Sequence, residues 1–195
     1  MTRSDSICFG LLAGGQSRRM GADKAALDWR GQALWQHQLR LAREISAHEV
    51  LISGRPGGPY CNAAKIIPDE IPNLGPLGGL SALLNAMSSD WLVAVAVDMP
   101  FLDVTTLREL LATRSGLAGV VPAIGERAEP LAAVYPRAAR ELVAQRLQLA
   151  DRSLQSFVRA AAEAGLVRLL PWPAEGAGVF RSVNTPEEFA AAQAR

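Results

Sequence analysis

Residues 91–98 read WLVAVAVD, an unbroken apolar run that ends in a carboxylate, and Asp90 stands immediately before the run. A strand with one face in water alternates apolar and polar residues, whereas an unbroken apolar strand is buried on both faces. Such strands are typical of the centre of a parallel sheet that is covered by helices on each side. The run therefore predicts an α/β architecture, with Asp98 at the carboxyl end of a central strand.

Apolar strands and amphipathic helices alternate along the chain around this run. We expect strands at residues 7–12, 49–53, 65–67, 91–97, 119–123, 131–135, 167–170 and 180–183. We expect helices at residues 33–47, 80–87, 105–113, 137–150, 153–164 and 186–194, and loops at the glycine- and proline-rich residues 54–59 and 72–79. The order predicts a three-layer α/β/α sandwich with a mostly parallel, doubly wound sheet.

The composition limits the class of protein. The chain has 195 residues, enough for one sizeable core, and we treat residues 1–195 as a single domain. A formal net charge of +1 offers no overall field for nucleic acid or an anionic membrane, and the longest apolar run is shorter than the roughly 20 residues that span a bilayer. Cys8 and Cys61 show neither metal-binding spacing nor a disulfide pattern. We expect a cytoplasmic monomer.

The loop after the first strand combines glycines with cationic residues: residues 11–24 read LLAGGQSRRMGADK. Gly14 and Gly15 let backbone N–H groups approach a phosphate closely, and Arg19 and Lys24 supply positive charge. The alternative is a glycine turn with solvated basic side chains. The spacing matches neither the P-loop nor the dinucleotide-binding fingerprint, which disfavours both of those classes.

Acidic residues follow other strands at the edge where open α/β sheets bind ligands. Asp98 could hold a hard cation that also contacts phosphate oxygens, or it could cap the next loop. Asp69 follows the strand at residues 65–67 in a similar way. His37 and His48 show no metal-ligand spacing, so we assign neither a catalytic role. The chain has no recognisable nucleophile elbow, which argues against a covalent hydrolase.

Several of these motifs, in this order, resemble the MobA-like nucleotidyltransferases, the family similar to molybdenum cofactor guanylyltransferase. The motifs are LLAGGQSRRMGADK (11–24), ALWQHQL (33–39), IIPDEIPNLGPLGGL (66–80), AVDMPFL (96–102), AEPLAAVYP (128–136) and VNTPEEF (183–189). The resemblance covers nearly the whole chain. It implies a nucleotide-diphosphosugar-transferase-like, Rossmann-like fold.

The resemblance also implies a reaction: GMP is transferred from GTP to molybdenum-molybdopterin, and pyrophosphate is released. By this resemblance the nucleotide-binding residues are Leu12, Ala13, Gly14, Gly15, Lys24, Ser53, Asp69 and Asp98, and Asp98 is the ligand of Mg²⁺. Arg19 would join Lys24 in holding the triphosphate, and both would act with Asp98 in catalysis. Asn184 would face the acceptor or complete the metal shell, or it would form a capping turn before Pro186. The implied protein partners are those that deliver or receive the cofactor.

Alternatives remain open at the base-binding position and at the level of function. Many relatives carry an asparagine-containing NANR-like segment where this chain has Ser53-Gly54-Arg55, so the role of Ser53 in base recognition is open. A CTP-using molybdopterin cytidylyltransferase and a sugar-phosphate nucleotidyltransferase are the related alternatives. A domain that binds GTP without turning it over is an alternative of another class.

Overall fold

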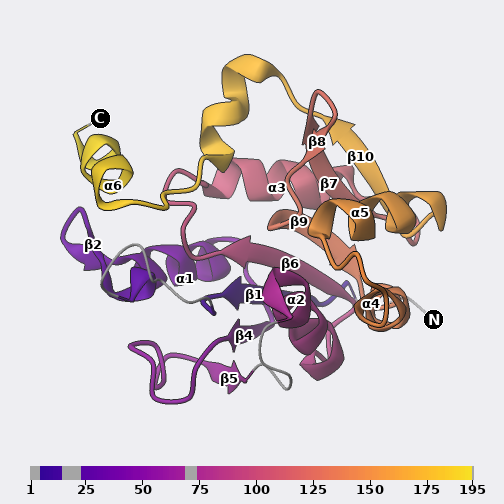
Figure 1. Cartoon of the computed structure of the whole chain (residues 1–195), viewed down its shortest axis with the longest axis horizontal. Helices are drawn as coiled ribbons and strands as arrows, with labels where there is room; N and C mark the ends of the chain where they lie inside the picture. The colour runs from indigo at the N-terminus through magenta and orange to yellow at the C-terminus, as the bar shows by residue number, and fades with distance from the viewer. Residues whose placement is uncertain (1–4, 15–22, 69–73, 195) are drawn as a thin grey trace.

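One mixed sheet runs through the molecule, with helices on both of its faces (Figure 1). The structure is a computed structural model and describes residues 5–14, 23–68 and 74–194. The strands are β1 (Ile7–Leu12), β2 (Asp28–Trp29), β3 (Gln32–Ala33), β4 (Glu49–Ser53), β5 (Lys65–Ile67), β6 (Trp91–Ala96), β7 (Gly119–Ile124), β8 (Arg127–Ala128), β9 (Ala132–Pro136) and β10 (Val167–Pro171). The helices are α1 (Leu34–Glu44), α2 (Gly75–Ala86), α3 (Val104–Thr113), α4 (Ala139–Leu147), α5 (Leu154–Glu163) and α6 (Pro186–Gln193), with 3-10 turns η1 (Lys24–Ala26) and η2 (Ala174–Phe180).

The strand order of the main sheet is β10-β7-β9-β6-β1-β4-β5, and β8 pairs with β7 at its side. Strand β6 pairs parallel with β1, β1 with β4, and β4 with β5, as an apolar central strand predicts. Only β9 interrupts this pattern between β6 and β7, since it runs antiparallel to both. The short β7–β8 hairpin reverses the chain before β9, so no crossover helix intervenes there. The mostly parallel sheet confirms the predicted fold class.

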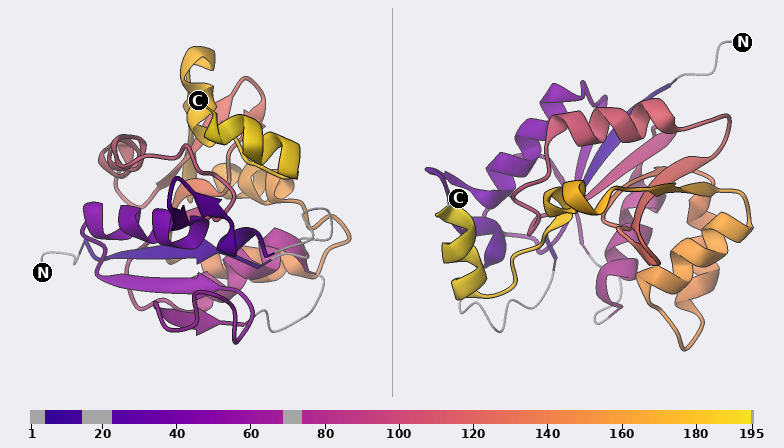
Figure 2. Two further views of the ribbon diagram at one scale, coloured as in Figure 1. Left: turned by 90° about the vertical axis from the view of Figure 1, so that its left-hand side faces the viewer. Right: turned by 90° about the horizontal axis from the view of Figure 1, so that it is seen from above.

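Helices cover the two faces of the sheet separately, which Figure 2 shows from above. On β1, Phe9 and Leu11 belong to the core that lies against α1 and α3, whereas Cys8 and Leu12 belong to the core under α2, α4 and α5. The alternation follows from the two-residue period of a strand. The predicted three layers are therefore present, with one core on each face of the sheet.

The start of α2 differs from the prediction, which placed residues 72–79 in a loop and began the helix at Leu80. The helix begins at Gly75, where φ is +64°, and Pro76 stands in its first turn, a position that proline tolerates well. Gly79 lies within the helix, and a Cβ there would be only 2.7 Å from Ser53 Oγ. Glycine in this segment thus permits close packing of α2 on the sheet.

The predicted strand at residues 180–183 is wrong. Residues 174–180 form η2, and residues 181–184 have no regular structure. Val183 is buried, and its N–H donates to the Asp98 carbonyl oxygen at 2.8 Å. The apolar residues of this segment were expected to enter a ladder, but they pack under the loop that follows β6.

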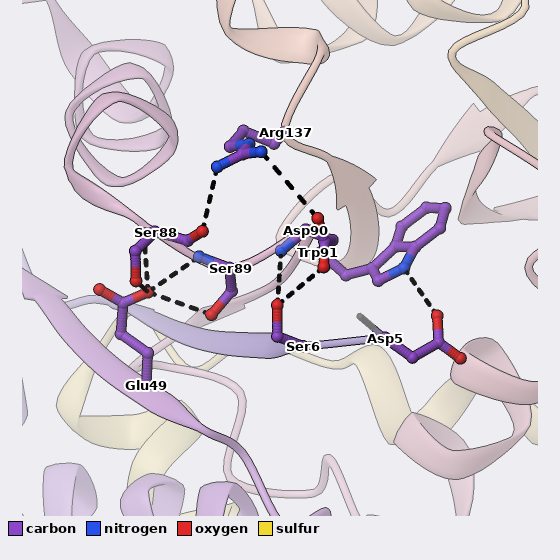
Figure 3. Close-up of polar contacts among 8 residues, drawn as sticks. All are labelled: Asp5, Ser6, Glu49, Ser88, Ser89, Asp90, Trp91 and Arg137. Atoms are coloured by element: carbon purple, nitrogen blue, oxygen red, sulfur yellow. Dashed lines mark hydrogen bonds and ion pairs between the residues drawn. The ribbon is translucent and has the colours of Figure 1, made fainter. Parts of the chain in front are cut away.

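Polar side chains connect the strands at the amino edge of the sheet (Figure 3). Glu49, the first residue of β4, accepts hydrogen bonds from the N–H groups of Ser88 and Ser89 at 2.9 and 3.3 Å and from both hydroxyls. Ser6 donates to the Asp90 carboxylate at 2.8 Å and accepts from the Asp90 N–H at 3.1 Å. Asp90 and Glu49 therefore fix the strand ends at this edge.

The contact between β7 and β9 leaves no room for a side chain at Gly119. A Cβ at Gly119 would lie 2.1 Å from the Val134 carbonyl oxygen, a backbone atom of β9. Because β9 is paired on both sides, we expect Gly119→Ala to lower the free energy of unfolding by about 3 kcal/mol. Urea denaturation measures this change. Gly178→Ala, which meets no heavy atom within 4 Å, is the control and should unfold like the wild type; equal stability of the two variants would contradict the prediction.

Candidate functional site

The carboxyl ends of β1, β4 and β6 form one continuous edge. The Ala13 N–H donates to the Ser53 carbonyl at 2.9 Å, and the Val97 N–H donates to the Leu12 carbonyl at 3.0 Å. These bonds extend the ladder beyond the strand ends, so the loops after the three strands begin side by side. They also engage the Ala13 N–H and the Leu12 carbonyl within the sheet.

Lys24 joins two of the residues that the sequence singled out. Its Nζ lies 3.1 Å from Asp98 Oδ2 and 2.8 Å from Asn184 Oδ1. The Lys24 and Asp98 side chains are 19% and 23% exposed, so a ligand from solvent could reach both. Its ammonium group is therefore held between a carboxylate and an amide oxygen. The three residues come from η1, the loop after β6 and the segment before α6.

The local structure around Asn184 fixes which of its amide atoms faces Lys24. Asn184 Nδ2 donates to Ser182 Oγ at 3.0 Å, which leaves Oδ1 directed at the ammonium group. The Asn184 N–H donates to the Glu188 carboxylate at 2.6 Å, and Thr185 caps α6 by accepting from the Glu188 N–H at 3.2 Å. The capping turn predicted before Pro186 therefore exists, but Thr185 is the cap and Asn184 is left to bind Lys24.

A second ion pair connects the turn that carries Lys24 to the loop after β4. Asp23 caps η1 by accepting from the Ala25 N–H at 3.0 Å, and its other carboxylate oxygen lies 2.8 Å from the Arg55 guanidinium. The Arg55 N–H donates to the hydroxyl of the buried Tyr60 at 3.1 Å. Asp23 and Tyr60 were not among the predicted site residues, and both help to place the loops around Lys24.

The remaining predicted residues are placed only in part. Ser53 is 1% exposed and lies next to Gly79, so its side chain is covered by α2. Gly14 is exposed and is the last described residue of its loop. Gly15, Arg19 and Asp69 lie outside the described residues, so their predicted roles stay predictions.

Two side chains of α1, His37 and Gln38, contact the loop that follows Asp98, and neither was among the predicted site residues. Gln38 Nε2 donates to the Met99 carbonyl at 2.6 Å. His37 Nε2 lies 3.0 Å from the Pro100 carbonyl, which can only accept, so the ring carries its proton on Nε2. Gln32 Nε2 lies 3.5 Å from the other ring nitrogen. The sequence feature that could have indicated these contacts is the pair His37-Gln38 in ALWQHQL, two adjacent polar residues in a helix that packs on the sheet.

The donor set around Asp98 suits a magnesium ion that is shared with a substrate. Within the described ranges no group of three or more His, Cys, Asp or Glu residues could hold a metal by itself. Mg²⁺, however, is commonly held by one or two carboxylates together with water and substrate phosphates. The Asp98 carboxylate and the Asn184 amide oxygen are hard oxygen donors of this kind. The described residues therefore fit the expected ion.

A cavity of about 440 Å³ lies on the α1 side of the loop at residues 100–104. Its lining includes Trp29, Arg30, His37, Arg40 and Phe101 and does not include Lys24, Asp98 or Asn184. The cavity is thus separate from the contact between those three residues.

No described helix is long and apolar enough to cross a membrane.

Comparisons with known proteins identify the family. A family model described as the MobA-like NTP transferase domain matches residues 10–165. A protein of Opitutus terrae named "Probable molybdenum cofactor guanylyltransferase" is 36% identical over 190 residues, which cover 95% of this chain and 94% of the relative. The molybdenum cofactor guanylyltransferase of Pseudomonas fluorescens is 35% identical over 148 residues, or 73% of this chain and 74% of the relative.

A solved structure shares the fold. Molybdopterin-guanine dinucleotide biosynthesis protein A from Archaeoglobus fulgidus superposes with a TM-score of 0.76 over 96% of this chain and 97% of that chain. The two sequences are 22% identical, so this likeness concerns the fold alone. The implied nucleotidyltransferase fold is confirmed.

The environment of His37 predicts a pH dependence of stability. Burial and the neighbouring Arg40 guanidinium lower the pKa of His37 from its usual 6.5; Arg30 acts in the same direction, whereas Glu44 and the Pro100 carbonyl oppose it. The unfolded chain then binds a proton at a higher pH than the folded protein does. The free energy of unfolding should therefore decrease as the pH falls from about 7 to 5. In His37→Gln, the share of this decrease in the free energy of unfolding that comes from protonation of His37 should be absent.

Urea denaturation of both proteins across this pH range checks the prediction. The difference between the two curves isolates His37 from the carboxyl groups, which titrate in both proteins. Wild-type and variant curves that stay parallel between pH 7 and pH 5 would contradict it.

Proposed function

The chain belongs to the MobA-like NTP transferase family, and on this premise we propose that it transfers GMP from GTP to molybdenum-molybdopterin. The products would be the guanine dinucleotide form of the cofactor and pyrophosphate. The names of the relatives from Opitutus terrae and Pseudomonas fluorescens support this activity. The continuous sheet supports treating residues 1–195 as one catalytic domain, which we expect to act as a monomer.

The observation that carries the proposal is the position of the Lys24 ammonium group between Asp98 and Asn184 at the carboxyl edge of the sheet. A nucleotidyltransferase needs a cation for the triphosphate, a carboxylate for a metal ion and a polar group for the acceptor at one place. The three side chains have these chemical properties. We therefore assign Lys24 to the triphosphate, Asp98 to Mg²⁺, and Asn184 to the acceptor or the metal shell.

The chemistry depends on positioning and charge neutralisation. A terminal phosphate oxygen of molybdopterin would form a bond to the α-phosphorus of GTP while the bond from that phosphorus to the pyrophosphate oxygen breaks. The attacking phosphate is already anionic at neutral pH, so no strong general base is required. Lys24 would hold the triphosphate and neutralise the departing pyrophosphate. Mg²⁺, when bound, supplies further charge neutralisation and orients phosphate oxygens.

The other predicted residues complete the proposal. The backbone of residues 12–15 would approach the nucleotide, and Asp69 would contact it. Arg19 is assigned to the triphosphate on its charge. Ser53 is assigned to the nucleotide by the resemblance, although α2 covers its side chain. Proteins that deliver molybdopterin or receive the product would make transient contacts with this edge of the sheet.

Pyrophosphate release tests the activity and the choice of base. The purified protein with Mg²⁺ and molybdenum-molybdopterin should release pyrophosphate from GTP in preference to CTP, ATP and UTP. Asp98→Asn keeps the size of the side chain and removes its charge, so we expect turnover to fall about 100-fold or more. A preference for CTP would favour the cytidylyltransferase, and saturable GTP binding without release would favour a non-catalytic domain.

Removal of the Lys24 charge should weaken the binding of GTP. A charge-assisted hydrogen bond contributes about 1.5–3 kcal/mol, so Lys24→Met should raise the Kd for GTP by about 10–100-fold. Isothermal titration calorimetry measures this constant. Lys65→Met changes the exposed lysine at the start of β5 and serves as the matched control, with unchanged affinity expected. Equal affinities in the two variants would place Lys24 away from the triphosphate.

A further inference from the structure

The loop that begins at Asp98 is fixed through three successive backbone carbonyls. The Asp98 carbonyl accepts from the Val183 N–H at 2.8 Å. The Met99 carbonyl accepts from Gln38 Nε2 at 2.6 Å, and the Pro100 carbonyl lies 3.0 Å from His37 Nε2. Two of the three donors are adjacent side chains of α1, and the third belongs to the segment that carries Asn184.

Gln38 is an unusual residue for its surroundings. It is 0% exposed, and it lies on the face of α1 that also buries Leu34 and Leu41. Its Oε1 is buried and has no hydrogen-bond partner among the described residues. An apolar side chain of similar length would pack there without leaving a polar atom unsatisfied. Packing therefore does not explain the amide, whereas the bond to the Met99 carbonyl does.

The same carbonyl also orders the turn of the loop. The Leu102 N–H donates to the Met99 oxygen at 3.2 Å, so that Gln38 and Leu102 share one acceptor. Phe101 packs edge-on against Trp29, with ring centroids 5.5 Å apart. The loop is thus held against α1 by hydrogen bonds and ring packing, and the Asp98 carboxylate at its start contacts Lys24.

We propose that Gln38 and His37 are positioning residues of the nucleotidyl transfer, which hold the loop at residues 98–102 so that the Asp98 carboxylate keeps its place beside Lys24. They touch no reacting atom and act through the Met99 and Pro100 carbonyls. This inference rests on the proposed function, because the position of Asp98 matters for turnover only if Asp98 holds the metal ion used with GTP.

Gln38→Met tests the proposal in the full-length chain. The variant keeps the length and burial of the side chain and removes the donor to Met99, so its thermal stability should stay close to that of the wild type. The Leu102 amide should exchange its hydrogen about ten-fold faster, measured by NMR. The Mg²⁺ concentration for half-maximal pyrophosphate release should rise about 10–100-fold, as is common when a residue that orients a metal ligand is changed. The KM for GTP at saturating Mg²⁺ should stay unchanged.

Two controls separate positioning from general damage. Leu39→Ala removes a buried side chain of the same helix that has no hydrogen-bond donor for the loop carbonyls, and it should lower the Tm without changing the Mg²⁺ requirement. His37→Phe removes the donor to Pro100 and should raise the Mg²⁺ requirement. His37→Gln, whose amide can donate to the same carbonyl, should have the Mg²⁺ requirement of the wild type.

The outcomes distinguish the inference from the function on which it rests. Faster Leu102 exchange together with a raised Mg²⁺ requirement supports the proposal. The proposal is overturned if the Leu102 amide of Gln38→Met exchanges at the wild-type rate. It is also overturned if that amide exchanges faster while the Mg²⁺ requirement is unchanged. If Gln38→Met does not fold, the His37→Phe and His37→Gln pair decides between the same outcomes. A wild-type protein that releases no pyrophosphate from GTP refutes the proposed function, whereas hydrogen exchange still reports whether Gln38 orders the loop.

Discussion

The parallel pairing of β1 with its two neighbours is the constraint on which the candidate site depends. Because β4 and β6 run in the same direction as β1, their carboxyl ends meet at one edge, and the bonds from Ala13 to Ser53 and from Val97 to Leu12 keep them in register. A shift of one residue between β6 and β1 would reverse the faces of the β6 side chains and displace the loop that carries Asp98. The position of Asp98 beside Lys24 is therefore a property of the sheet as a whole.

The two edges of the sheet use similar residues for different purposes. At the amino edge, the carboxylates of Glu49 and Asp90 accept hydrogen bonds from neighbouring serines and so hold the strand ends together (Figure 3). At the carboxyl edge, Asp98 faces a lysine and an amide oxygen that remain accessible from solvent. Asp90 and Asp98 flank the same apolar run, so their difference comes from the direction of the chain.

The sequence was sufficient for the layers of the fold and insufficient for the contacts between distant segments. The unbroken apolar run predicted the central strand, and the alternation around it predicted the sandwich. The beginning of α2 was missed because Gly79 looks like a loop residue until its packing against Ser53 is known. The contacts of Gln38 were missed because periodicity reports which face of a helix is buried and not what a buried amide binds. For Lys24, Asp98 and Asn184 the family motifs gave the residues, and only the structure shows that they touch.

The contact between Lys24 and Asn184 joins residues that are 160 positions apart, and this separation has a consequence during protein synthesis. At roughly 5–20 residues per second, a ribosome adds Asn184 about 8–32 s after Lys24. Throughout that interval the nascent chain has the lysine without the amide oxygen that it contacts in the folded protein. Helix α6 then packs on the antiparallel pair of β2 and β3, which follows η1, through Phe189 and Trp29, whose ring centroids are 5.8 Å apart. The site is therefore assembled late in translation, by a segment that arrives after the central strands of the sheet.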